Sequence, residues 1–244
     1  MTQDKALSKT PISLKGSLPL YVEITEQIAR QIAAGHLVDG QKLPPEREMA
    51  AGYGISVGTL RKALSRLIEM GLVQSIQGSG NYIQKTENAA SIYSFFRLEL
   101  LSGGGLPHAH LLSYQFCRKV ADLPAFGKDE YAHLFRRLRY LDDEPIALEE
   151  IWLDGAVGTI KEKTLISESL YQFFKDEFGI WITKAEDWVG LSEVPDWTEL
   201  PFSLGTGELA GFIERFGTSQ TDEIVEYSRT WFDSRKARYV SRLK

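Results

Sequence analysis

The fold of the N-terminal region is decided by residues 54–72, which read GISVGTLRKALSRLIEMGL. Ser56 stands where a helix N-cap is expected, because its hydroxyl can accept a hydrogen bond from a backbone N–H one turn later. Apolar residues then recur with the spacing of one buried helix face, at Leu60, Ala63, Leu64, Leu67 and Ile68. Gly71 ends this pattern, so the stretch predicts a helix with a single apolar face.

Two further helices and a hairpin surround this helix in the sequence. An apolar repeat that begins near Pro19 predicts a first helix, and Leu43-Pro44-Pro45 introduces a short second helix that ends at Gly54. The segments 72–77 and 81–85 resemble strands and are joined by Gly78-Ser79-Gly80, which predicts a hairpin. This order, over residues 17–84, is typical of a helix-turn-helix with a wing, which is a DNA-binding architecture.

The third predicted helix has polar side chains on the face opposite its apolar side. Arg61 and Lys62 can reach phosphates or base edges, and Thr59 stands near the helix N-terminus, where small neighbours permit a close approach. The narrow hairpin tip can enter a minor groove. We therefore expect double-stranded DNA as a partner.

The net charge of −5 is unusual for a DNA-binding protein, so its distribution along the chain matters. Residues 1–16 carry +2 and residues 17–85 carry +1, which leaves −8 for the rest of the chain. The predicted DNA-binding region is nearly neutral. Its affinity must depend on a few well-placed cations rather than on total charge.

The other bulk properties are those of a globular protein of 244 residues, with 43% hydrophobic and 25% charged residues. No apolar run is long enough for a transmembrane helix, so we expect no membrane partner. Residues 1–16 are predicted to be a disordered polar arm, without the apolar core of a signal peptide. The single cysteine, Cys117, cannot form an internal disulfide, which fits a cytoplasmic protein.

A second domain is expected over residues 93–244, after a polar linker at residues 85–92. Helical patterns occur at 93–101 and 170–177. Strand-like runs occur at 111–117, 134–141, 145–153, 208–216 and 224–232. This mixture predicts an α+β fold with a mostly antiparallel sheet.

Two arginines in this domain indicate an anion site. Arg137 and Arg139 lie two residues apart in a predicted strand, so both side chains point to the same face. Their charges repel each other unless an anion lies between them, and guanidinium groups suit carboxylate or phosphate. Ser169, just before the second helix, offers a hydroxyl and backbone N–H groups to an anion. The alternative is that the arginines form ion pairs with Glu149 and Glu226 across neighbouring strands.

No other residues form a convincing metal or catalytic motif. His108 and His110 share one face of an extended segment, but no third metal ligand is obvious, so loop histidines are the simpler interpretation. Gly103-Gly104-Gly105 lacks the lysine and hydroxyl residue of a phosphate-binding loop. We therefore expect no metal and no cofactor. Four aromatic residues are expected in the core or at a dimer interface, namely Trp181, Trp188, Trp197 and Trp231.

The N-terminal region resembles the GntR family of bacterial transcription regulators. The resemblance rests on Pro19-Leu20-Tyr21, on GQKLPPEREMA at 40–50, on TLRKAL at 59–64, on Gly71-Leu72-Val73 and on QGSG at 77–80. It implies DNA contacts by Arg47, Thr59 and Arg61 and a wing tip at Gln77 and Gly78, to which the hairpin adds Ser79 and Gly80. Val57 departs from the family pattern, because many members have arginine there. That base contact is either missing or replaced by apolar contact with a thymine methyl group.

Residues 92–244 resemble the UTRA ligand-sensing domain of the HutC-like branch of this family. The resemblance rests on Arg137-Leu138-Arg139, on DEPIALE at 143–149, on ESLY at 168–171 and on IVEYS at 224–228. It implies a chorismate-lyase-like fold in which Arg137, Arg139, Ser169 and Tyr171 hold the acidic end of an effector. It also implies that Glu149 and Glu226 bind the polar end of the effector, with Ser94 reaching it from the linker side.

Two functions follow from these features. The first is a transcription regulator, expected to be a repressor, that binds an inverted-repeat operator as a homodimer and responds to a small anionic metabolite. The second is a small-molecule enzyme, a lyase or hydrolase, that uses the chorismate-lyase-like domain. No nucleophile–base pair in the sequence supports an enzyme, and a fold alone does not transfer activity. The regulator is therefore the expected function.

Overall fold

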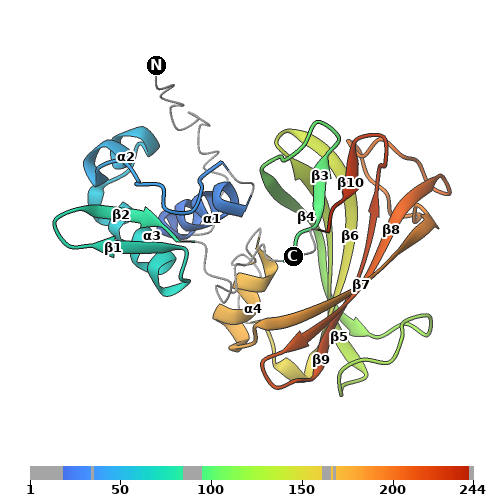
Figure 1. The fold of residues 1–244 in the computed structure, drawn as a ribbon. Coiled ribbons are helices and arrows are strands. Elements are labelled where there is room, and N and C mark those ends of the chain that lie inside the picture. The colour runs from blue at the N-terminus through green and yellow to red at the C-terminus, as the bar shows by residue number, and fades with distance from the viewer. Residues whose placement is uncertain (1–18, 34–35, 85–94, 161–165, 167–168, 242–244) are drawn as a thin grey trace. The chain divides into compact units, whose positions relative to one another are not determined.

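The structure is a computed structural model that describes residues 19–33, 36–84, 95–160, 166 and 169–241 (Figure 1). The chain divides into two compact units, Met1–Ser91 and Ile92–Lys244. The arm expected at residues 1–16 and the linker expected at 85–92 lie outside the described residues. No described helix is long and apolar enough to cross a membrane.

The first unit contains three helices followed by a hairpin (Figure 1). The elements are α1 (Leu20–Ala33), α2 (Glu46–Tyr53), α3 (Val57–Glu69), β1 (Val73–Ile76) and β2 (Gly80–Ile83). The Ser56 hydroxyl caps α3 by accepting a hydrogen bond from the Thr59 backbone N–H at 3.0 Å. Gly54 ends α2 with a φ of 66°, a left-handed conformation that glycine adopts without steric cost. The predicted winged helix-turn-helix is confirmed.

The core of the first unit lies between α1 and α3. Ile24 and Ile28 of α1 and Leu60 and Leu67 of α3 are fully buried. Each such side chain contributes roughly 1.5–3 kcal/mol on burial, so the apolar faces hold the two helices together. The predicted apolar face of α3 is wrong at Ile68, which is 41% exposed because it lies at the margin of the apolar stripe.

The second unit is built on a six-stranded antiparallel sheet with the order β4-β5-β6-β9-β8-β7. Its strands are β4 (Pro107–Arg118), β5 (Tyr131–Leu141), β6 (Glu144–Asp154), β7 (Ile182–Glu193), β8 (Leu209–Ser219) and β9 (Ile224–Phe232). A short 3-10 turn, η1 (Gly155–Val157), follows β6, and one helix, α4 (Leu170–Phe178), precedes β7. The predicted α+β class with a mostly antiparallel sheet is confirmed.

One face of this sheet carries two apolar clusters. The first cluster joins α4 to the sheet and contains the buried Phe135, Ile151 and Phe174. The second joins the sheet to β3 (Leu98–Leu100) and β10 (Ala237–Tyr239), and it contains the buried Leu98, Leu141, Ala147, Phe232 and Ala237. Because alternate side chains share a face, Arg137 and Arg139 lie between Phe135 and Leu141 on β5. The two arginines therefore occupy the space between the two clusters.

Three strands of the second unit, β3, β7 and β10, differ from the sequence-based expectation. The helix predicted at 93–101 is wrong in its described part, where Leu98–Leu100 form β3 and pair antiparallel with β10. This partner is remote in the sequence, so a local pattern could not indicate it. β7 was not predicted, because it is an edge strand whose residues are mostly exposed and lack a regular apolar alternation.

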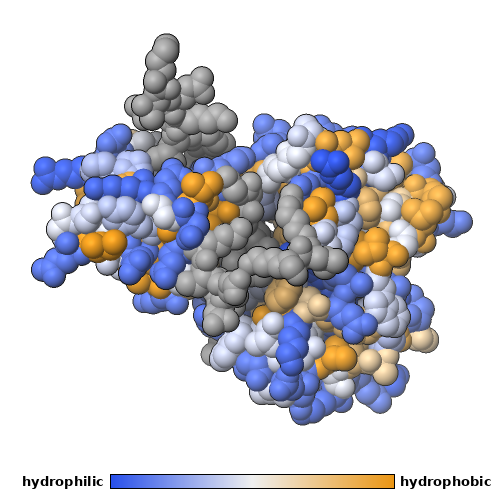
Figure 2. All heavy atoms as spheres, in the orientation of Figure 1, coloured by the Kyte–Doolittle hydropathy of each residue, from blue (hydrophilic) through white to orange (hydrophobic). Residues whose placement is uncertain are grey.

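The four tryptophans have different environments. Trp231 is buried, and Trp197 packs against it with a ring-centroid distance of 5.8 Å. Trp181 is 41% and Trp188 is 55% exposed, so neither of these two belongs to the core. Trp188 lies on β7 beside two other exposed apolar residues, Val189 and Leu191. Figure 2 shows hydrophobic residues at the surface of this unit in the region of β8 and β7.

Candidate functional site

The predicted DNA-contacting residues lie on accessible parts of α2, α3 and the hairpin. Arg47 and Lys62 are exposed, and Thr59 is half-buried beside its N-cap. The side chain of Arg61 is 67% exposed, and its Nε donates to Glu46 Oε2 at 2.7 Å. An ion pair as exposed as this one contributes little to stability, so Arg61 can exchange Glu46 for a phosphate at small cost.

The hairpin forms a narrow tip. Gln77, Gly78 and Gly80 are exposed, and the Ser79 hydroxyl is hydrogen-bonded to the Tyr82 hydroxyl at 2.6 Å. Gly78 has a φ of 74° and Gly80 a φ of 121°, so a side chain at either position would strain the turn. The absence of side chains at these two positions keeps the tip slim enough for a minor groove.

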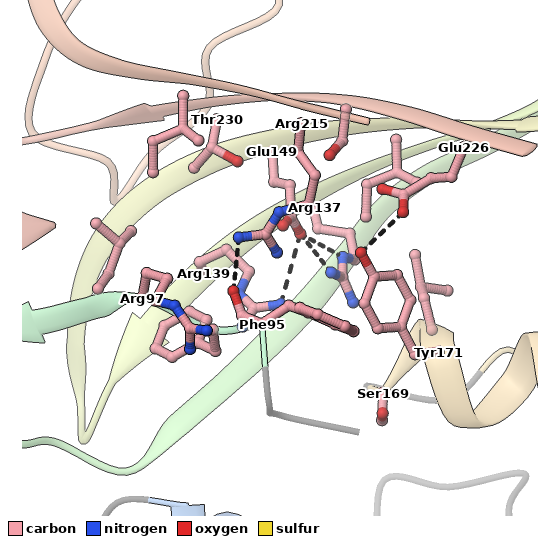
Figure 3. Close-up of a pocket in the computed structure, with 16 residues that line it drawn as sticks. Phe95, Arg97, Arg137, Arg139, Glu149, Ser169, Tyr171, Arg215, Glu226 and Thr230 are labelled. Atoms are coloured by element: carbon pink, nitrogen blue, oxygen red, sulfur yellow. Dashed lines mark hydrogen bonds and ion pairs between the residues drawn. The ribbon is translucent and has the colours of Figure 1, made fainter. Parts of the chain in front are cut away.

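A pocket opens in the second unit between the two apolar clusters (Figure 3). Its volume is about 720 Å³, which includes space open to solvent. Its charged and polar walls come from β5, β6, β8, β9, α4 and the segment before β3, and they include Arg97, Arg137, Arg139, Glu149, Ser169, Tyr171, Arg215 and Glu226. Six of the seven residues predicted to bind an effector line this pocket, whereas Ser94 lies outside the described residues.

Glu149 binds both predicted arginines. Arg137 donates to Glu149 Oε2 from Nε at 2.9 Å and also from Nη2, and Arg139 Nη1 lies 3.5 Å from the same oxygen. Arg137 is only 4% exposed and Arg139 only 7%. Burial by itself would raise the pKa of Glu149, but the charges of Arg137 and Arg139 outweigh it and lower that pKa. Cross-strand ion pairs are therefore present in the pocket, with one carboxylate shared by two arginines.

Glu226 is the second carboxylate in the pocket wall. The Tyr171 hydroxyl donates to Glu226 Oε2 at 2.8 Å, whereas the buried Oε1 has no hydrogen-bond partner among the described residues. Burial raises the pKa of Glu226 to about 6, although Arg215 and the hydrogen bond from Tyr171 act to lower it. A buried oxygen without a partner is costly, so a ligand that donates a hydrogen bond here would relieve that cost.

Arg215 on β8 is a pocket residue that the sequence did not indicate. It donates to Asp187 Oδ1 from Nε at 2.6 Å and to Asp187 Oδ2 from Nη2 at 2.7 Å. The same Nη2 donates to the backbone carbonyl of Phe95 at 2.6 Å (Figure 3). Asp187 belongs to β7, the strand that was not predicted, so the pairing that places Arg215 was not visible in the sequence.

Ser169 lies at the entry to α4 and is buried against the pocket. The positive end of the helix dipole is located here, and it favours a nearby anion. The position of Ser169 therefore agrees with an anion near the start of α4.

The remaining candidates do not form a site in the described part of the chain. His108 Nε2 lies 2.6 Å from the Asp142 carbonyl oxygen, and the His108 ring stacks on Tyr140. Among the described residues, no group of three or more His, Cys, Asp or Glu side chains could hold a metal ion. Gly103-Gly104-Gly105 forms a turn in which all three residues have positive φ.

Two family models match the chain. The family described as "Bacterial regulatory proteins, gntR family" matches residues 20–83. The family described as "UTRA domain" matches residues 107–238. The first match covers the helices and hairpin of the first unit, and the second covers the six-stranded sheet and most of the pocket.

Several curated proteins are similar to the chain over much of its length. The HTH-type transcriptional regulator SmoD of Agrobacterium fabrum is 49% identical over 230 residues, which cover 94% of this chain and 98% of SmoD. The mannosyl-D-glycerate transport/metabolism system repressor MngR of Escherichia coli is 28% identical over 227 residues, with 90% and 93% covered. The HTH-type transcriptional repressor NagR of Bacillus subtilis is 30% identical over 180 residues, with 72% and 74% covered.

A solved structure has a similar second unit. It is a ligand-binding domain from Bordetella bronchiseptica that is classed with the GntR-family regulators. The TM-score is 0.51 at 20% identity, and the match covers 62% of this chain and 99% of that domain. At this identity the similarity describes the fold alone.

Proposed function

Because the chain belongs to the GntR family of bacterial regulatory proteins and carries a UTRA domain, we propose that it is a repressor whose operator affinity is controlled by a small anionic metabolite. The protein is a DNA-binding transcription regulator. We assign residues 17–84 to DNA binding, residues 85–92 to the linker and residues 93–244 to effector binding and dimerisation. Repression is favoured by the names of NagR and MngR, both of which are called repressors.

The effector is inferred from one observation, which is the arrangement of buried arginines around a single shared carboxylate. Arg137 and Arg139 share Glu149, and Arg215 lies on a neighbouring part of the same wall. Among the described residues, four arginines line the pocket together with two carboxylates, Glu149 and Glu226. A small anion would bring a second countercharge to the arginines, and a hydroxyl or amine on the same molecule could donate to Glu226 Oε1.

The effector would control DNA binding by shifting the population of the protein between two arrangements. The effector would bind one arrangement of the paired DNA-binding units more tightly, and the operator would bind the other. The effect on operator affinity then equals the difference in effector affinity between the two arrangements. A twofold-symmetric dimer would recognise an inverted repeat with Arg47, Thr59, Arg61, Lys62 and the 77–80 tip.

Homodimerisation is supported by the exposed apolar side chains of β7. Trp188 is 55%, Val189 is 52% and Leu191 is 68% exposed, and all three lie on an edge strand. An edge strand with exposed apolar residues would be an aggregation risk in a monomer. Pairing with a second copy of the chain would cover it.

The lyase or hydrolase alternative is not favoured, because the similar curated proteins are transcription regulators. The pocket carboxylates also have structural partners, since Glu149 binds two arginines and Glu226 accepts from Tyr171.

The test is an electrophoretic mobility shift with DNA from upstream of the protein's own gene, at low salt and with a panel of small anions. Wild type should retard the DNA, and one or more anions should release it.

Arg139→Ala should retard the DNA but should not respond to the anion, and Arg61→Ala should fail to retard it. Arg118→Ala, which removes an arginine that is 70% exposed and outside the pocket, is the matched control and should behave as wild type. Retardation by Arg61→Ala equal to wild type would contradict the DNA assignment, and release of the Arg139→Ala complex would contradict the pocket assignment.

A further inference from the structure

Phe95 and Phe96 precede β3, and side chains of the pocket contact both residues; Figure 3 shows Phe95 beside Arg215 and Tyr171. The Phe95 carbonyl accepts a hydrogen bond from Arg215, and the Phe95 ring meets the Tyr171 ring edge-on at a centroid distance of 6.1 Å. The guanidinium carbon of Arg139 lies 4.6 Å from the centroid of the Phe96 ring. Three pocket residues on three different elements therefore contact this dipeptide.

Arg215 is fixed in place. Two of its nitrogens donate to the two oxygens of Asp187, and the Tyr239 hydroxyl donates to Asp187 Oδ2 at 2.8 Å. A bidentate arginine–carboxylate pair with this support holds its guanidinium in one orientation. The bond from Arg215 to the Phe95 carbonyl therefore has a rigid donor.

Arg139 and Tyr171 differ from Arg215, because the proposed function assigns both to the effector. An anion that binds Arg139 offsets part of its positive charge, and the attraction between the guanidinium and the Phe96 ring depends on that charge. An anion that accepts a hydrogen bond from Tyr171 competes with Glu226 for the hydroxyl and so changes the position of the ring beside Phe95. Both contacts are sensitive to occupation of the pocket.

We propose that Phe95 and Phe96 form a latch that converts occupation of the pocket into a change in the segment that enters the second unit. Arg215 is the positioning residue that holds the Phe95 backbone, and Arg139 and Tyr171 are the contacts that a ligand alters. The latch rests on the proposed function, because it needs an anion in the pocket. It lies directly after residues 85–94, through which the chain reaches the DNA-binding unit, so a change in the latch acts on that connection.

The test is hydrogen–deuterium exchange of the full-length protein with and without millimolar inorganic phosphate, read on peptides that cover residues 95–98. Binding is measured separately as a thermal shift, which must disappear in Arg139→Ala to count as binding in the pocket. In wild type, phosphate should change the exchange rate of residues 95–98 by about fivefold or more, the lower end of usual coupling factors.

Two variants separate the latch from anion binding. Phe96→Leu keeps an apolar side chain but removes the ring beneath Arg139, and Arg215→Lys keeps a cation for Asp187 but loses the fork that also reaches Phe95. In both variants phosphate should change the exchange rate of residues 95–98 by less than about twofold, compared with about fivefold or more in wild type. The matched control is Phe116→Leu, which alters a 48% exposed ring outside the pocket and should respond as wild type.

The outcomes distinguish the latch from the pocket. A phosphate-dependent thermal shift with unchanged exchange at residues 95–98 overturns the latch and leaves the anion site standing. A full exchange response in folded Phe96→Leu also overturns the latch. If phosphate causes no thermal shift in wild type, or a shift of the same size in Arg139→Ala, the anion site is overturned. The latch is then overturned as well, because it needs an anion in the pocket.

Discussion

Glu226 is fully buried in the pocket wall, and within the described part of the chain its Oε1 has no hydrogen-bond partner. Its pKa is raised from the ordinary value of 4.5 to about 6, chiefly by burial. The folded protein therefore holds this proton over a pH range in which the unfolded chain releases it. Stability falls as the pH rises from 4.5 through 6, because the folded state must then accommodate a buried charge.

Glu226→Gln should remove this pH-dependent cost. At pH 7.5 the variant should be more stable than wild type by up to about 2 kcal/mol, which corresponds to the pKa shift, and the difference should vanish near pH 4.5. All five tryptophans follow residue 150, so fluorescence during urea unfolding reports the second unit. A stability difference that does not change with pH would show that Glu226 titrates normally.

Glu149 forms ion pairs with both Arg137 and Arg139. Glu149→Gln should lower the free energy of unfolding of the second unit by about 3–5 kcal/mol, because two buried guanidinium groups lose a countercharge. Millimolar phosphate should restore part of that loss, and it should stabilise the variant more than it stabilises wild type.

The control for Glu149→Gln is an exposed ion pair between the last residue of β4, Arg118, and Glu130, which precedes β5. Glu130 is 73% exposed and accepts from Arg118, so Glu130→Gln should change stability by less than about 1 kcal/mol and should show no dependence on phosphate. If Glu149→Gln lowers the free energy of unfolding by no more than Glu130→Gln does, the shared carboxylate does not stabilise the two buried arginines.

At the scale of elements, α3 and β7 illustrate two kinds of local order. α3 has a side-chain N-cap at Ser56 and one apolar face, so its own sequence specifies it. β7 is held by its pairing with β8 along its length, and its outer edge has no strand partner among the described residues. The position of β7 therefore depends on β8. The position of Asp187 on β7, which orients Arg215, depends on the same pairing.

Ser56→Ala should weaken α3 by about 1 kcal/mol, because the Thr59 N–H loses its acceptor at the helix N-terminus. Circular dichroism should show a lower melting temperature for the first unit, and operator affinity should fall with it. Ser56→Asn restores an N-cap acceptor and should recover the stability. If alanine and asparagine behave alike, the cap does not stabilise α3.

At the scale of the whole molecule, the two units differ in net charge and in the function that we propose for each. The DNA-binding unit is nearly neutral, so its affinity for DNA depends on a few cations, whereas the acidic second unit has four arginines in the lining of its pocket. We infer that two DNA-binding units bind one operator and that the second unit pairs them.

Leu191→Glu should disrupt this pairing, because it places a charge on the 68% exposed apolar edge of β7. Light scattering coupled to size exclusion should show a dimer for wild type and a monomer for the variant, and the variant should bind the operator more weakly. Val120→Glu, at an exposed apolar residue just after β4, is the matched control and should remain dimeric. A dimeric Leu191→Glu protein would place the interface elsewhere.

The sequence by itself determined the winged helix-turn-helix and the shared face of Arg137 and Arg139. Caps, turn glycines and helical or strand periodicity act between residues close in the chain, so they can be read without a structure. Only the tertiary structure decided that β3 pairs with β10, that β7 exists, and that Arg215 reaches the Phe95 carbonyl. These features join residues that are far apart in the sequence, and no local pattern specifies which distant partner a strand or a guanidinium group will find.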